Sequence, residues 1–299
     1  MAVRVRCITD PACVWSWAFE PVVRTLMVEF GDDLEWTFVM GGLAREYGAD
    51  AGWGPGGGKA GMAEHWLEAT AESGMPTDPL AWSEGPLAST YPACMAVKAA
   101  QEQGREAAYR YLRALREGIV CRRRKLDTTE ALVEEARGAG LDAERFRVDL
   151  DSHAIVEAFG ADLEESRDVP DVARDVGKVR CSAAVGEERV PFPTLRFEGA
   201  GASPGSEAGA AEPIVRWTCG MRPYDFVRDQ ALAAGAQPSG DPHPTVLEAV
   251  QRFGTIAPVE VAAACDLPLP RAEAELAQLA LDWKIRPVPV LAGRLWELA

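Results

Sequence analysis

The fold of this chain is decided by the stretch Asp10-Pro11-Ala12-Cys13-Val14-Trp15-Ser16-Trp17. Apolar and basic residues alternate over residues 3–7, which predicts a β-strand, and Asp10-Pro11 predicts the turn that ends it. Residues 19–30 carry apolar side chains at helical spacing, so Cys13 falls at the first turn of a helix. Unpaired backbone N–H groups and the helix dipole lower the pKa of a thiol there, which makes Cys13 a candidate nucleophile. The alternative is a small buried residue in a tight turn.

The segments next to this stretch indicate an α/β fold. Pro21 removes a backbone donor from the predicted helix, so we expect a kink near Trp17. Residues 34–40 are mostly apolar and predict a second strand. Two strands joined by one helix form a β-α-β unit, which favours a parallel strand pair.

The rest of the chain divides by its patterns into further parts. A Gly-rich run at residues 52–58 predicts a loop, and the pattern from 60 to 175 is helical almost throughout. Residues 194–197 and 214–218 predict an antiparallel hairpin with a Gly/Ala/Ser-rich tip, followed by a helix. We therefore expect an N-terminal β-α-β unit at 1–59, a helical insertion at 60–178, the hairpin and its helix at 179–235, and a C-terminal module at 236–299.

The C-terminal module follows a linker-like stretch and has a pattern of its own. Three amphipathic helices and a hairpin predict a small winged-helix-like arrangement, in which the third helix would read DNA. Between residues 270 and 282 that helix carries one arginine against three acidic residues. Its charge has the wrong sign for DNA, so we expect a packing or protein-contact element.

Composition and charge exclude several classes of protein. With 299 residues, 47% of them hydrophobic, the chain is long enough for one or two globular domains. Its 31 basic and 46 acidic residues give a net charge of −15, which predicts no nucleic-acid partner and no membrane partner. Seven cysteines cannot all pair within one chain, and the N-terminus lacks a secretory pattern. We therefore expect a reduced, cytoplasmic protein.

Ordered motifs over roughly the first 235 residues resemble the DsbA family, and most closely its cytoplasmic FrnE-type branch. The Cys13 stretch is similar to the Asp-Pro-x-Cys-x-Trp-Cys-Trp/Tyr motif of that branch. Other resembling segments lie at residues 89–100, 140–146, 192–195 and 220–224. The resemblance implies an α/β thioredoxin fold with a large helical insertion, to which the C-terminal module is added.

The resemblance also implies roles for individual residues. Cys13 takes the place of the attacking thiol, and Ser16 takes the place of the resolving cysteine. Because a serine cannot form a disulfide, this CxxS pair cannot carry out net dithiol oxidation. Pro193 takes the place of the family's cis-proline, with Phe192 beside it. The residues expected to contact substrate are Trp15, Trp17, Phe192, Pro193 and Thr194.

Several functions remain open from the sequence. We first expect a monothiol oxidoreductase or isomerase, in which Cys13 exchanges with protein thiols, disulfides or glutathione while Ser16 donates a hydrogen bond to the thiolate. Alternatively, Cys181 resolves the mixed disulfide. In a further alternative, redox turnover is lost and the fold serves as a binding scaffold or protease adaptor. The last alternative is a glutathione-dependent transferase or isomerase, although isomerases of this fold carry their serine at the first motif position.

The sequence predicts no metal and no nucleotide cofactor, while glutathione stays open as a co-substrate. The three histidines are far apart, no Cys/His spacing fits zinc, and no dinucleotide or Walker motif follows a strand. Cys94 and Cys265 lie in apolar helical contexts typical of a core. The basic run at residues 121–125 is either a solvated helix end or a site for an acidic peptide or glutathione. The oligomeric state does not follow from the sequence.

Overall fold

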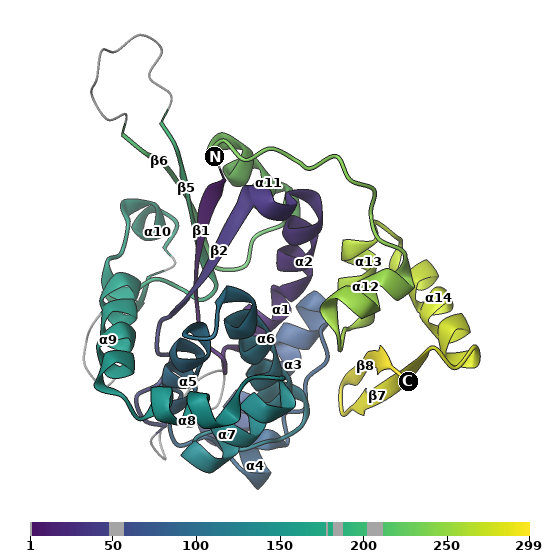
Figure 1. Ribbon diagram of the computed structural model, residues 1–299, viewed down its shortest axis with the longest axis horizontal. Coiled ribbons are helices and arrows are strands. Elements are labelled where there is room, and N and C mark those ends of the chain that lie inside the picture. The colour runs from purple at the N-terminus through teal and green to yellow at the C-terminus, as the bar shows by residue number, and fades with distance from the viewer. Residues whose placement is uncertain (1, 48–56, 178, 182–187, 202–211) are drawn as a thin grey trace.

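The computed structural model describes residues 2–47, 57–177, 179–181, 188–201 and 212–299 (Figure 1). Its central sheet has the strand order β2-β1-β5-β6. β1 (Val3–Thr9) pairs in parallel with β2 (Leu34–Met40) and antiparallel with β5 (Thr194–Gly199). β6 (Ile214–Cys219) completes the predicted antiparallel hairpin with β5. The predicted α/β thioredoxin fold, including its parallel first strand pair, is confirmed.

Two helices rather than one kinked helix follow β1. α1 (Val14–Ala18) and α2 (Glu20–Glu29) are separated by Phe19, so the break lies two residues after the expected position. Pro21 lies in the first turn of α2, where its missing N–H would have had no partner within the helix. The short 3-10 helix η1 (Gly31–Asp33) then leads into β2.

The insertion between β2 and β5 is helical, as predicted. Its helices are α3 (Gly58–Ser73), α4 (Ala81–Glu84), α5 (Tyr91–Gln101), α6 (Arg105–Arg116), the π-helix η2 (Glu117–Cys121), α7 (Thr129–Gly138), α8 (Ala143–Leu150), α9 (His153–Arg167) and α10 (Asp171–Asp175). An unpredicted two-residue strand pair, β3 (Arg180–Cys181) with β4 (Glu188–Arg189), ends it. Most of the Gly-rich run and the hairpin tip lie outside the described residues. No helix within the described ranges is both long enough and apolar enough to cross a bilayer.

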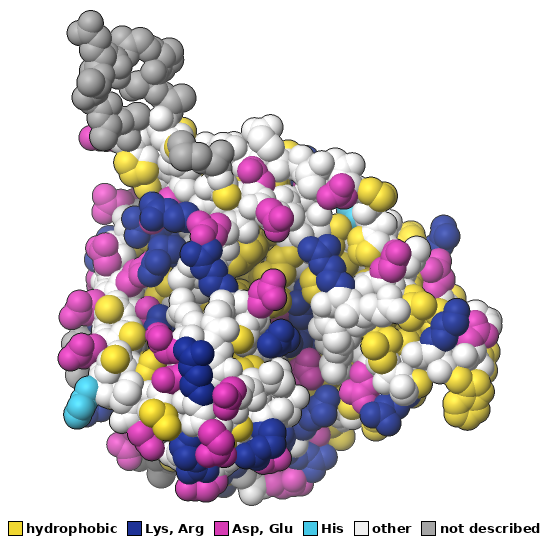
Figure 2. All heavy atoms as spheres, in the orientation of Figure 1, with side chains coloured by type: hydrophobic (Ala, Val, Ile, Leu, Met, Phe, Trp, Pro, Cys, Tyr) yellow, Lys and Arg dark blue, Asp and Glu magenta, His cyan; other side chains and the backbone are white. Residues whose placement is uncertain are grey.

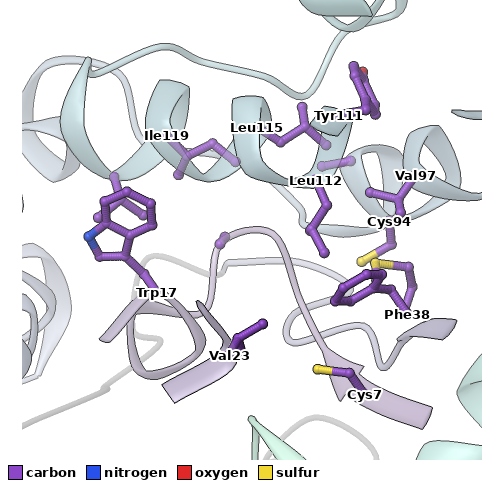
Figure 3. Close-up of a cluster of buried hydrophobic side chains, with 14 of the residues drawn as sticks. Cys7, Trp17, Val23, Phe38, Cys94, Val97, Tyr111, Leu112, Leu115 and Ile119 are labelled. Atoms are coloured by element: carbon purple, nitrogen blue, oxygen red, sulfur yellow. The ribbon is translucent and has the colours of Figure 1, made fainter. Parts of the chain in front are cut away.

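One hydrophobic core joins the insertion to the β-α-β unit. Figure 3 shows side chains of both parts in this core; those labelled are Cys7, Trp17, Val23, Phe38, Cys94, Val97, Tyr111, Leu112, Leu115 and Ile119. Phe38 of β2 stacks on Tyr109 of α6 with ring centroids 5.1 Å apart. Because each fully buried large apolar side chain contributes about 1.5–3 kcal/mol, the insertion is held to the sheet by packing along its length.

The C-terminal module follows α11 (Tyr224–Ala233) and lies beside α2 (Figure 1). Its elements are α12 (Val246–Phe253), α13 (Pro258–Ala264), α14 (Leu269–Leu281), β7 (Ile285–Val290) and β8 (Gly293–Leu298). These are the three helices and the hairpin that the sequence predicts, while their winged-helix assignment remains a prediction. The module has a small core of its own, and α13 packs against α2.

Buried ion pairs fasten the module to the rest of the molecule. Glu260 of α13 is fully buried and accepts hydrogen bonds from both terminal nitrogens of Arg113, at 2.7 and 2.9 Å. Nε of Arg24 in α2 donates to the same carboxylate at 3.2 Å. Arg113 also donates to Glu117 at 2.8 Å and to the Thr255 carbonyl at 3.0 Å. A buried carboxylate requires such partners, so the module is docked rather than loosely tethered.

Candidate functional site

Cys13 is the N-cap residue of α1, at the end of the turn that follows β1. Its backbone is extended (φ −76°, ψ 107°), and its N–H donates to the Asp10 carbonyl at 3.2 Å. The side chain is only 5% exposed, and the thiol faces the Phe192 carbonyl oxygen, with Sγ 3.9 Å from it. The two segments that the sequence singled out, the Cys13 stretch and the Phe192-Pro193 stretch, therefore meet.

The electrostatics of Cys13 differ from the expectation. Burial raises the pKa of its thiol, and the nearby Asp10 adds to this, while Ser16 and the Arg189 guanidinium lower the pKa without outweighing the burial. The predicted lowering of the pKa is therefore wrong. With only five residues, α1 has a small dipole to stabilise a thiolate. Burial beside Phe192 would also remove the water that a thiolate needs.

Ser16 lies within the first turn of α1 and is 3% exposed. Its Oγ is buried without a hydrogen bond of ordinary geometry, although its hydroxyl and amide are near enough to the sulfur to lower the thiol's pKa. The position at which the resemblance places a resolving thiol thus holds a buried hydroxyl. It can stabilise a thiolate, but it cannot accept the second sulfur bond.

Asp10 organises the turn that carries Cys13, a role that sequence analysis missed. Its fully buried carboxylate accepts hydrogen bonds from the Ala12 N–H at 2.8 Å, the Leu43 N–H at 2.6 Å and the Thr90 hydroxyl at 2.8 Å. Burial raises the pKa of Asp10, and these donors oppose the rise. Asp10 therefore ties the Cys13 turn to the loop after β2 and to the start of α5.

Cys13 lines a pocket of about 500 Å³. The Cys13 turn and the Pro191-Phe192 segment form part of its wall, α3 forms another part, and Arg180 and Arg189 of β3 and β4 complete it. Two predicted substrate contacts, Trp15 and Phe192, line this pocket. The indole Nε1–H of Trp15 donates to Nε2 of His65 at 3.0 Å, so a residue of the insertion holds the indole in place.

The position of the Phe192 ring depends on Gly41, the residue that follows β2. A Cβ placed on Gly41 would lie 2.1 Å from Cζ of the Phe192 ring, so only glycine admits the ring in this position. The peptide bond between Phe192 and Pro193 is cis. Pro193 and Thr194 are buried behind the pocket and do not line it, and the Thr194 hydroxyl donates to the Pro191 carbonyl at 2.6 Å. The structure therefore does not place Pro193 and Thr194 in contact with a ligand in this pocket. They instead support the Pro191-Phe192 segment that lines it.

The prediction for Trp17 is also wrong. Its ring is fully buried, its Nε1–H donates to the Pro76 carbonyl at 2.8 Å, and the Arg113 guanidinium lies 4.3 Å above its centroid. Residues two positions apart on a helix point to nearly opposite sides. Trp15 therefore faces the pocket, whereas Trp17 enters the core of the insertion.

Four polar pocket residues were missed from the sequence: His65, Glu72, Arg180 and Arg189. Burial lowers the pKa of His65, Glu68 opposes this, and Arg180 adds to the lowering. Arg189 lies four residues before Pro193, and its position next to that motif is the one sequence signal that could have found it. Nothing in the sequence placed α3 beside Cys13.

Three other cysteines were considered from the sequence, two as core residues and one as a resolving thiol. Cys94 and Cys265 are buried, as predicted, and burial raises the pKa of Cys265 to about 11. The side chain of Cys181 lies outside what the structure describes, so its resolving role remains a prediction. Within the described ranges, no group of three or more His, Cys, Asp or Glu residues could hold a metal ion.

Comparison with known proteins gives both a family and relatives. The family model described as Thioredoxin matches residues 7–172. The chain is 29% identical over 290 residues to the ClpXP adapter protein SpxH of Halalkalibacterium halodurans, covering 96% of this chain and 86% of that protein. The protein of the same name from Bacillus subtilis is 26% identical, with the same coverage.

Two solved structures share the fold. A putative protein disulfide isomerase from Nitrosomonas europaea superposes with a TM-score of 0.57 at 20% identity, over 77% of this chain and 96% of that one. The cytosolic disulfide reductase DsbM from Pseudomonas aeruginosa superposes with a TM-score of 0.50 at 17% identity, over 77% of this chain and 93% of that one.

Proposed function

This chain belongs to the thioredoxin family, since that family's model matches more than half of its residues, and we propose that it acts as an adapter protein. In this role it binds a substrate protein and brings it to a ClpXP-type protease. The pocket beside Cys13 is the proposed binding site for the substrate protein, with Trp15 and Phe192 as its apolar contacts.

The adapter proposal rests on how much of the chain the named adapters match. The two curated relatives named as ClpXP adapters match 96% of the chain, whereas the two disulfide-exchange structures cover 77% of it. A fold alone does not decide function, and the function of one relative does not transfer by fold. A relative that matches nearly the whole chain, C-terminal module included, is the better guide.

The chemistry of the site supports a binding role. A disulfide oxidoreductase needs a thiolate at neutral pH and a second thiol to release its partner. Burial raises the pKa of Cys13, and Ser16 stands in place of the second thiol. The site therefore retains the shape of a thioredoxin-type groove without the two features that drive turnover. In the cytoplasm, where we propose that the protein works, its cysteines would stay reduced.

A second candidate function is monothiol exchange, favoured by the observation that Cys13 lines the pocket. In this reaction the Cys13 thiolate attacks a disulfide, forms a mixed disulfide and releases one thiolate. An external thiol then attacks the mixed disulfide and regenerates Cys13. The raised pKa of Cys13 would keep the first step slow at neutral pH.

Protein half-lives in the source organism separate the two functions. We would compare the parent strain, a strain lacking this chain, a strain with inactive ClpP, and the deletion complemented by the Cys13→Ala variant. If the chain is an adapter, the set of proteins whose half-lives lengthen without the chain should overlap with the set whose half-lives lengthen without ClpP activity. The Cys13→Ala variant should restore the turnover of the shared proteins. If the two sets do not overlap, the chain is not an adapter. If they overlap but only the wild-type chain restores turnover, Cys13 chemistry is required.

A further inference from the structure

Two arginines face each other across the β3–β4 pair. Arg180 and Arg189 are direct cross-strand partners, and both line the pocket that contains Cys13. Side chains opposite one another in an antiparallel pair share a face, and like charges in this arrangement are destabilising. Such a pair is therefore stable only when something between or beside the two charges compensates for their repulsion.

The protein supplies Arg189 with little compensation. Arg189 is only 8% exposed, its Nη1 donates to the Val190 carbonyl at 2.9 Å, and its guanidinium lies 4.1 Å above the Phe192 ring centroid. No ion pair joins Arg189 or Arg180 to a carboxylate within the described ranges. Burial lowers the pKa of Arg189 and Arg180 adds to the lowering, while the charges of Cys13 and Asp10 oppose it without reversing it. Because a buried cation without a hydrogen-bonded anion is costly, and no described carboxylate pairs with this one, the guanidinium is available to an anion that enters the pocket.

The arginines of the basic run at residues 121–125 differ from Arg189 in this respect, because they are paired with carboxylates. In the basic run at residues 121–125, Arg123 pairs with Asp78 and Glu84, each at 2.7 Å, and Arg124 pairs with Glu135. On the face shown in Figure 2, basic and acidic side chains are interspersed. The acid-binding role considered for the basic run therefore has little support, since its arginines are already paired.

The rest of the pocket is compatible with an anionic ligand. His65 is on the α3 side, and its Nε2 is occupied by the Trp15 indole. Glu72 lines the pocket but is exposed, and no ion pair joins it to either arginine. Phe192 and Trp15 add apolar surface beside the cations. A ligand that fits these walls combines a carboxylate with an apolar group.

We propose that Arg189, with Arg180 beside it, binds a carboxylate from an acidic segment of a partner protein, whose neighbouring apolar side chain packs on Phe192. This role rests on the adapter function proposed above and names the chemistry by which the adapter would recognise its substrate protein. Arg189 supplies the planar, bidentate donor pair that carboxylates prefer, already oriented by its stacking on Phe192.

Alkylation of Cys13 by two reagents of similar size tests the anion site without a known partner. Iodoacetate carries a carboxylate and iodoacetamide is neutral, and both react with the same thiolate with loss of iodide. The ratio of their rates is therefore independent of the pKa of Cys13. We expect this ratio, measured at low salt on the Cys13 peptide by mass spectrometry, to be about tenfold higher than for N-acetylcysteine amide.

Variants of the full chain assign the effect to the arginine. Arg189→Gln should lower the ratio to that of the small thiol, and Arg189→Lys should keep part of it because the charge remains. Arg294→Gln, at an exposed arginine of β8, is the matched control and should keep the wild-type ratio. A wild-type ratio equal to that of the small thiol, or an unchanged ratio in Arg189→Gln, would overturn the anion site.

Protection experiments identify the source of the carboxylate. An amidated peptide with adjacent Glu and Leu should protect Cys13 from iodoacetamide, its Gln counterpart should not, and Arg189→Gln should abolish the protection. Protection by S-methylglutathione but not by the Glu peptide would overturn the peptide ligand, and so would no protection at all. None of these measurements involves a protease, and the half-life test leaves Arg189 intact, so either proposal can fail while the other stands.

Discussion

Glu260 and Arg113 form a bidentate ion pair between α13 and α6, at 2.7 and 2.9 Å, inside a protein interface from which water is excluded. The same guanidinium lies against Trp17, the residue that follows Ser16 in α1. The C-terminal module is thus connected through one side chain to the helix that carries the candidate site.

Replacing Glu260 by Gln should lower the free energy of unfolding by about 3–5 kcal/mol, because Arg113 and Arg24 would remain buried with less negative charge to pair with. Urea unfolding measures this change. Glu275→Gln, which removes an exposed partner of Arg271, is the control and should cost less than about 1 kcal/mol. Equal effects of the two substitutions would contradict the importance of the buried pair.

The rate of Cys13 alkylation should rise with pH through a midpoint above the ordinary value for a cysteine, because burial raises the pKa of this thiol. Only the thiolate reacts, so a raised pKa shifts the whole profile towards higher pH. The profile is measured with iodoacetamide by mass spectrometry. Ser16→Ala should move the midpoint further up, since Ser16 lowers the pKa in the native protein. A midpoint below neutral pH would instead favour the catalytic monothiol function.

Gly41→Ala should displace Phe192 from the pocket wall, because the added methyl group would lie 2.1 Å from the ring. Overpacking of this kind costs about 1–3 kcal/mol of stability, measurable by urea unfolding. The Glu-containing peptide should also lose its protection of Cys13. Adding Phe192→Leu to Gly41→Ala should recover part of the stability, and no recovery would show that the clash lies elsewhere.

The Trp15 indole N–H resonance should titrate with a midpoint below 6.5, because burial lowers the pKa of the His65 ring that accepts its hydrogen bond. The neutral ring is favoured in the folded state. Its contribution to stability is therefore complete above the unfolded pKa of 6.5 and is lost as the pH falls through the folded value. NMR spectroscopy follows the resonance, assigned with Trp15→Phe, and His65→Gln should abolish the transition. A midpoint above 6.5 would contradict the burial of His65.

Periodic patterns made most of the fold predictable, whereas contacts between distant segments did not follow from them. The strands and the helices of both parts were found because alternation and helical spacing are local properties. Cys13, Trp15 and Phe192 were found because they lie in short motifs. His65 is 50 residues from Trp15, and Arg189 reaches the pocket from the end of the insertion, so only the folded chain brings them together.

Burial also accounts for two of the wrong site predictions, those for Cys13 and Trp17. The helix N-terminus alone predicts a lowered pKa for Cys13, but the loss of water under Phe192 is a tertiary effect that reverses its direction. Likewise, Trp15 and Trp17 are equivalent by type and neighbourhood, and they differ only in which side of a five-residue helix each one occupies. Neither property can be read from residues 10–17 by themselves.

The serine at position 16 has one more consequence. A pair of neighbouring thiols would close into a disulfide whenever the cell becomes oxidising, and the wall of the pocket would then alternate between two covalent forms. Because Ser16 cannot form a disulfide, no such bond can close within this motif. Oxidation can therefore alter this wall only through Cys13 itself, by joining it to an outside group, and not by closing a bond within the motif.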